Sequence, residues 1–200
     1  MDAAKQDLKA YLTRSRADLV AKLDGLDEYD ARRPLTPTGT NLLGLVKHVA
    51  YVQLGYLTET FSRDPGPAFP EGEVNADMWA RPDETREQIL ELHRYSARRS
   101  DETIDELPLD TVGRVPWWAP DKAEVTLHRI LVHVIDETAR HTGQADILRE
   151  LIDGAAGRRP GDPSLPGWAP DEWQAYRDRL EAAARAAVPD QGTGSTRNTG

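Results

Sequence analysis

The chain has 200 residues, no cysteine and a formal net charge of −9. This length suffices for one domain with its own hydrophobic core, and the lack of cysteine excludes disulfides, thiolate metal sites and cysteine nucleophiles. The negative charge argues against nucleic-acid binding, which depends on Lys and Arg at phosphates. Because no stretch has the apolar length of a membrane span or signal peptide, we expect a cytoplasmic protein without membrane or nucleic-acid partners.

Four long segments repeat apolar residues at three- and four-residue steps, which is the pattern of amphipathic helices. Asn41 and Asp83 are suited to cap the free amides of the second and third helices. Gly154 follows the last apolar repeat of the fourth and is a typical helix stop. The predicted helices cover residues 3–26, 41–60, 83–107 and 127–153.

The connections between these helices are rich in chain breakers. Residues 62–82 contain four prolines and predict a long loop, and a second loop carries Trp117 and Trp118. A short helix is expected over 171–187. No segment alternates with a period of two, so we expect no strands and predict an all-α four-helix bundle. Its domain covers residues 1–187, and residues 188–200 form a tail expected to be disordered, since its end has nothing apolar to bury.

Ionisable residues interrupt two of the apolar stripes. Glu137 and His141 are four residues apart and therefore share one helical face with Val134, while His48 follows Leu45 on the stripe of the second helix. A buried, unpaired carboxylate costs several kcal/mol, and one cation could satisfy all three groups. Two His and one Glu suit zinc, nickel or ferrous iron, with a position free for water or substrate. A buried polar network without metal remains the alternative.

Two further residues are candidates for a role in catalysis. His133 lies one turn before Glu137, where it could be a fourth ligand, a hydrogen-bond partner or a proton shuttle. Gln144 lies three residues after His141 and could hydrogen-bond a metal-bound water. Trp117 and Trp118 could form a pocket wall or belong to the core.

Several segments resemble the DinB-like superfamily. The stretch LVHVIDETARHTGQADILRE over residues 131–150 is similar to the last bundle helix of that family, and NLLGLVKHVA over 41–50 to its second helix. VPWW at 115–118 and GDP at 161–163 extend the resemblance. It implies an up-down-down-up bundle with the metal triad on His48, Glu137 and His141.

The glutamate at position 137 makes the triad similar to that of one branch of this superfamily. This branch contains mycothiol-dependent maleylpyruvate isomerase and mini-circle protein, and its zinc has a His-Glu-His ligand set. The resemblance implies a metal-dependent thiol transferase or isomerase that lowers the pKa of mycothiol for attack on a small electrophile. Mycothiol belongs to actinobacteria, and the excess of Arg over Lys fits their GC-rich genomes. A metal-dependent hydrolase and a non-catalytic, stress-related or small-molecule-binding protein remain alternatives, and a homodimer is compatible with such a bundle.

Overall fold

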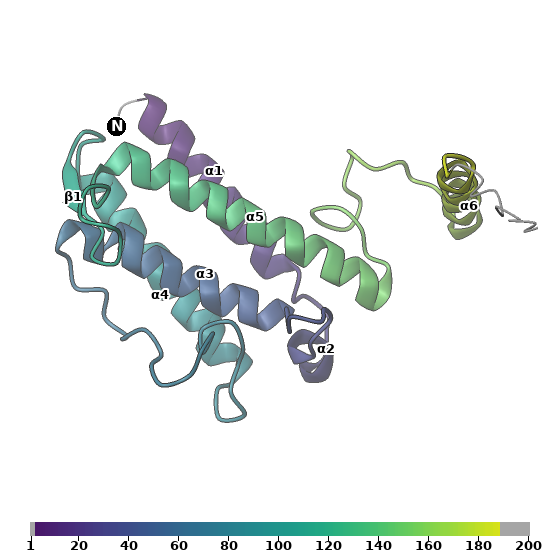
Figure 1. The fold of residues 1–200 in the computed structure, drawn as a ribbon, viewed down its shortest axis with the longest axis horizontal. Coiled ribbons are helices and arrows are strands. Elements are labelled where there is room, and N and C mark those ends of the chain that lie inside the picture. Colours follow the sequence, from purple (N-terminus) through teal and green to yellow (C-terminus); the bar gives the residue numbers. More distant parts are fainter. Residues whose placement is uncertain (1–2, 189–200) are drawn as a thin grey trace, which may run out of the picture. The chain divides into compact units, whose positions relative to one another are not determined.

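A computed structural model of the chain describes residues 3–188 and is mostly helical (Figure 1). Two short elements flank the second long helix, and a further helix lies near the carboxyl end. The helices are α1 Ala3–Ala21, α2 Glu28–Arg32, α3 Leu42–Leu57, the 3-10 helix η1 Glu59–Phe61, α4 Arg86–Glu106, α5 Leu127–Asp153 and α6 Pro170–Ala186. The predicted all-α class is confirmed.

The helix ends follow local capping chemistry. Asn41 caps α3 as predicted, because its side chain accepts a hydrogen bond from the Gly44 amide. The α4 cap is Thr85 and not Asp83, since Thr85 forms a capping box with Gln88. Gly154 ends α5 at φ 76°, a conformation that favours glycine. α1 ends earlier than predicted because residues 22–25 form a turn.

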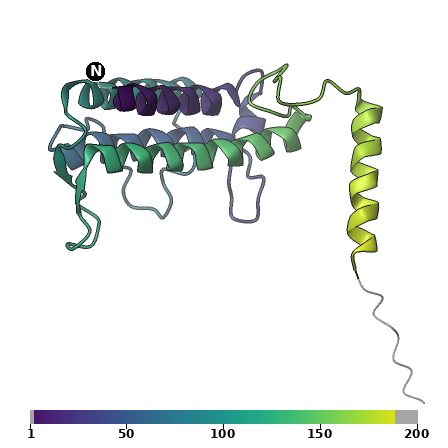
Figure 2. The same cartoon turned by 90° about the horizontal axis from the view of Figure 1, so that it is seen from above.

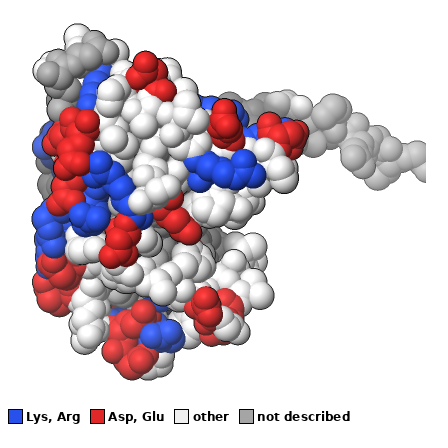
Figure 3. Space-filling view, turned by 90° about the vertical axis from the view of Figure 1, so that its left-hand side faces the viewer, with Lys and Arg blue, Asp and Glu red and all other residues white. Residues whose placement is uncertain are grey.

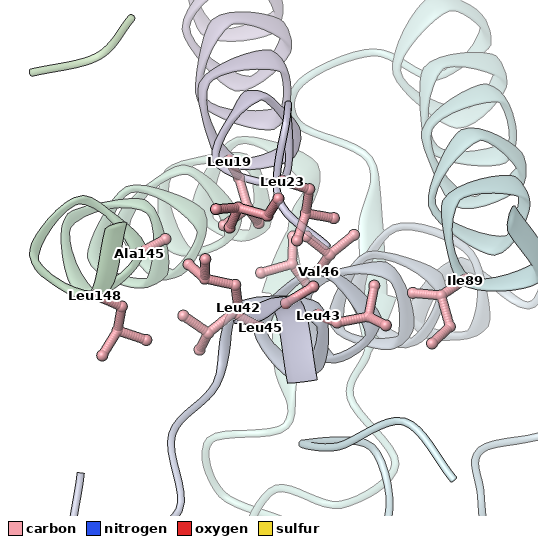
Figure 4. Packing of buried hydrophobic residues seen from close by; sticks show 12 residues of the cluster. Leu19, Leu23, Leu42, Leu43, Leu45, Val46, Ile89, Ala145 and Leu148 are labelled. Carbon is pink, nitrogen blue, oxygen red and sulfur yellow. The ribbon is translucent and has the colours of Figure 1, made fainter. Parts of the chain in front are cut away.

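Two apolar clusters fix the directions of the four long helices. The first joins the second half of α1 and of α5 to the first half of α3 and of α4; its members include Leu19, Leu45, Ile89 and Leu148 (Figure 4). The second joins the opposite halves through Leu57, Ile104, Ile130 and, at its edge, Leu8. α1 and α5 therefore run one way and α3 and α4 the other, which is the up-down-down-up order. α1 and α4 form one layer and α3 and α5 the second (Figure 2).

Buried polar residues separate the two clusters, and every long helix contributes to them. In Arg16, Nε donates to Gln53 Oε1 at 2.5 Å and Nη1 to Asp101 Oδ1 at 2.7 Å. Burial lowers the pKa of Arg16, and the contact with Asp101 opposes that shift. The other members of this layer include His93, Ser96, Ser100, Thr138 and Thr142. The middle of the bundle is thus the place where polar side chains face inward.

The expectation that the chain has no strands was wrong. β1 (Val112–Arg114) pairs antiparallel with β2 (Glu124–Thr126), and Gly113 lies opposite Val125. Strands of three residues are too short to show a period-two pattern in the sequence. The hairpin loop between them carries Trp117 and Trp118. At this end of the molecule acidic and basic side chains are interspersed (Figure 3).

The chain divides into two compact units, residues 1–160 and 161–200. The second unit contains α6, where Trp168, Trp173 and Tyr176 contact one another through their rings. Residues 189–200 of the predicted disordered tail lie outside the described residues, and the domain limit at 187 stays a prediction. Within residues 3–188, no helix is both long and apolar enough to cross a membrane.

Candidate metal centre

His48 on α3 and Glu137 and His141 on α5 meet at the interface of these two helices. One potential ligand atom from each lies within 4.8 Å of the others. The Nε2 atoms of His141 and His48 are 3.1 and 3.8 Å from Glu137 Oε1. The two imidazole rings meet edge to face, with centroids 4.7 Å apart. The structure therefore brings the three predicted ligands together, although α4 and two loops separate them in sequence.

Each imidazole has a second partner on the side away from Glu137. His48 Nδ1 is 2.5 Å from Asp77 Oδ2, and His141 Nδ1 is 2.8 Å from Gln144 Oε1. An ionised carboxylate and an amide oxygen only accept hydrogen bonds, so each Nδ1 must carry the proton. The Nε2 atoms of both rings face Glu137, and Nε2 of His141 donates a hydrogen bond to Glu137 Oε1 at 3.1 Å. A metal ion at this place would take the position of that proton. Such outer partners are the usual means of orienting metal-binding histidines, and the donor set fits a divalent ion.

Asp77 is the site residue that the sequence did not reveal. It lies in the proline-rich connection between α3 and α4 and is only 6% exposed. Burial alone would raise the pKa of Asp77, but the hydrogen bond and charge of His48, together with the Lys47 ammonium, hold it below its ordinary value. Asp77 is therefore a carboxylate at neutral pH. No periodicity marks such a residue in a loop.

Lys47 fixes the loop that carries Asp77. Its side chain is fully buried, and Nζ donates to the carbonyls of Ala76 and Trp79 and pairs with Glu84 at 2.8 Å. The glycine at 44 allows the same loop to approach α3, since a Cβ there would lie 1.8 Å from the carbonyl oxygen of Met78. The outer partner of His48 is thus held by contacts on both sides of Asp77.

The exposure of the three ligand candidates shows that the site is open on one side. Their side chains are 18% exposed for His48, 29% for Glu137 and 9% for His141. A cavity of about 580 Å³ lies against His48 and Glu137 and is walled mainly by residues of α3 and of the loop that follows it. A ligand bound at the triad could therefore be reached from this cavity.

The two predicted catalytic residues lie on different sides of the triad. His133 lines the cavity, and its ring centroid is 4.6 Å from that of Tyr56 and 5.5 Å from that of Trp118. Gln144 lies on the Nδ1 side of His141, away from Glu137. Trp117 also lines the cavity, where its Nε1 donates to the Tyr56 hydroxyl at 3.4 Å.

Comparisons with known proteins show the family of the chain and a protein of similar fold. The sequence model of a family described as mycothiol-S-transferase matches residues 7–154, which include all three ligand candidates. A crystal structure described as a conserved protein from Enterococcus faecalis aligns with a TM-score of 0.56 and 19% identity, covering 78% of this chain and 99% of that one. At this identity the match supports the fold alone. Among curated proteins, none matches this sequence.

Proposed function

The chain belongs to the mycothiol-S-transferase family, and on this premise we propose that it joins mycothiol, through its sulfur, to a small electrophile in a reaction that requires a divalent metal ion. The observation that carries the proposal is the arrangement of His48, Glu137 and His141, whose ligand atoms lie within 4.8 Å of one another beside an open cavity. Zinc is the expected ion, with nickel or ferrous iron as alternatives, because nitrogen and carboxylate donors suit all three.

The three side chains would hold the ion through two neutral imidazoles and one carboxylate. Asp77 and Gln144 support this by accepting the Nδ1 hydrogen bonds of His48 and His141, so that each Nε2 would bind the ion, in His141 in place of the proton shared with Glu137. We assign Gln144 this positioning role, since it lies on the far side of His141. A bound divalent ion lowers the pKa of a coordinated thiol and so supplies a thiolate at neutral pH.

His133 is the residue of the cavity wall best placed to handle protons. It lies one helical turn from Glu137, and its imidazole can accept the proton that the thiol loses. In a displacement, the sulfur–carbon bond forms while the leaving group departs with its electron pair. In an addition, His133 returns the proton to the product. The Tyr56 and Trp118 rings pack against this partly buried histidine.

Other aspects of the proposal rest on the family and the sequence. We propose that the protein acts in the cytoplasm of an actinobacterium, because mycothiol is made there. We further propose that residues 1–187 form one functional domain and that the protein can form a homodimer. Each of these is a prediction that follows from the resemblance of the chain to its family.

Metal content and thiol transfer test the proposal together. The untagged protein is equilibrated with zinc, and its zinc content and its consumption of mycothiol with methyl 4-(bromomethyl)benzoate are measured beside His48→Ala, Glu137→Ala and the exposed control His128→Ala. We expect about one equivalent of zinc in the wild type and the control, with zinc and turnover lost in both triad variants. If the protein stays metal-free after equilibration with zinc, His48, Glu137 and His141 form a buried polar network without metal.

The same experiment separates the competing functions. Hydrolysis of ester probes without added thiol would indicate a metal-dependent hydrolase. A full equivalent of zinc without turnover of any thiol or ester would favour a non-catalytic binding protein.

A further inference from the structure

The cavity beside the triad has an uneven distribution of charge. Two carboxylates, Glu59 and Glu137, are among the residues that line it, and none of the lining residues is Lys or Arg. The remaining lining is apolar or aromatic apart from His48 and His133. An acceptor that enters this cavity therefore meets negative charge and no fixed cation from a side chain.

We propose that this cavity admits electrophiles with a planar apolar body and no negative charge, and that Glu59 is the residue that excludes anionic ones. The proposal deepens the function proposed above and rests on it for the reaction, because it names the class of acceptor. It assigns a specificity role to a residue outside the ligand set.

The planar apolar body is inferred from the aromatic wall. Tyr56, Phe69 and Trp117 line the cavity, and Tyr56 meets Trp117 edge to face at a centroid distance of 5.1 Å. Gly55 leaves room for this arrangement, since a Cβ at that position would lie 2.8 Å from the Trp117 ring. Aromatic groups pack well on such walls in offset or edge-to-face geometry. A flat ring can therefore pack against this wall.

The exclusion of anions is inferred from the surroundings of Glu59. It begins η1 directly beyond the end of α3, where the helix dipole adds partial negative charge. Within the described part of the chain, no hydrogen bond or ion pair engages its carboxylate. Nearby Arg63 pairs with Glu106 at 2.6 Å, and Arg129 lies over Trp118, which does not line the cavity.

The charge balance of the proposed reaction leaves Glu59 uncompensated. If His48, Glu137 and His141 hold a divalent ion, the carboxylate of Glu137 and a bound thiolate would match its two positive charges. Among the residues that line the cavity, Glu59 then keeps a negative charge that no lining cation compensates. A unit charge roughly 6 Å away, at an effective dielectric between those of a protein surface and water, changes binding by about tenfold.

A matched pair of electrophiles tests the selection. Methyl 4-(bromomethyl)benzoate is neutral, and 4-(bromomethyl)benzoate carries one negative charge on the same ring. With mycothiol, each forms a carbon–sulfur bond as the carbon–bromine bond breaks; bromide leaves with the bonding electrons and the thiol proton passes to the buffer. The ratio of kcat/KM for ester over carboxylate is measured after subtraction of the uncatalysed rate.

We expect the zinc-loaded wild type to prefer the ester by about tenfold beyond the uncatalysed preference. Glu59→Gln should reduce this preference several-fold, and Glu59→Lys should abolish or reverse it. Glu150→Gln is the matched control, because Glu150 is exposed on α5 and lies roughly 20 Å along the helix from Glu137. An unchanged ratio in Glu59→Gln, or equal use of both probes by the wild type, would overturn the proposal.

Binding of unreactive analogues separates this inference from the proposed function. Methyl 4-methylbenzoate and 4-methylbenzoate are compared by ligand-observed NMR with mycothiol present. If neither bromide reacts but the ester analogue binds more tightly and Glu59→Gln narrows the difference, the transferase function fails and the charge selection stands. If both analogues bind equally to the wild type, the charge selection fails whatever the turnover.

Discussion

Replacing Asp77 by Asn should weaken zinc binding without removing any ligand. The Asp77 carboxylate is 2.5 Å from Nδ1 of His48 and nearly buried, so water cannot easily take its place. The Asn amide can turn its NH2 group toward Nδ1 and favour the tautomer that carries its proton on Nε2, which blocks the ligand atom. Loss of such an outer partner typically costs 10- to 100-fold in metal affinity, or about 1.4 to 2.8 kcal/mol.

The affinity is measured by competition with a chromophoric zinc chelator at neutral pH. Asp83→Asn serves as the control, because Asp83 is an exposed residue near the end of the same connection, and its carboxylate pairs with Arg81 at 3.3 Å. Gln144→Leu should lower the zinc affinity less than Asp77→Asn does. His141 donates to the neutral amide oxygen of Gln144, and hydrogen bonds to a charged acceptor such as Asp77 are roughly twice as strong as neutral ones. A zinc affinity of Asp77→Asn within about twofold of the wild type would refute the orienting role of Asp77.

Three further substitutions probe the loop and the core. Gly44→Ala places a Cβ 1.8 Å from the Met78 carbonyl oxygen before relaxation. It should lower the free energy of unfolding, measured with urea, by about 1 to 3 kcal/mol and also weaken zinc binding. An unchanged free energy of unfolding would show that the loop has room to move. Lys47→Met removes the buried partner of Glu84 and should lower the free energy of unfolding by about 2 kcal/mol, which is measured as a lower thermal midpoint. Adding Glu84→Gln to this variant should partly restore the midpoint. Burial, aided by Arg16 and Arg94, lowers the pKa of His93 to about 4, so the unfolded chain binds a proton first as the pH falls below about 6.5. Stability should therefore drop by about 2 kcal/mol between pH 7 and pH 5, and a His93→Leu variant that shows the same drop would contradict this origin.

The sequence predicted the bundle because its helices carry the information locally. Apolar spacing marks the buried face of each long helix, and Asn41 and Gly154 mark two of the ends. The i, i+4 spacing of Glu137 and His141 places both on one face of α5. The interrupted stripes made it possible that His48 converges with these two residues, and the family resemblance then implied that the three form one triad.

Other features depend on contacts that have no sequence pattern. Asp77 reaches His48 only because Lys47 and the close approach at Gly44 hold the loop against α3. The strands β1 and β2 pair through backbone groups over three residues each, and α2 is a helix of five residues. The burial of Arg16 follows from its position between the two apolar clusters, where Gln53 and Asp101 receive its hydrogen bonds.

Because α3 and α4 run in the same direction, the segment that connects them is long and can change with little effect on the packing of the bundle. Residues 58–85 must return along the length of α3, which has 16 residues and is roughly 24 Å long. Fully extended, this connecting segment would span several times that distance. The surplus length forms the part of the cavity wall that holds Phe69, while the three triad residues stay on helices that the core keeps in place. Insertions or substitutions ahead of Asp77 can therefore alter which molecules fit the cavity, while His48, Glu137 and His141 keep their places.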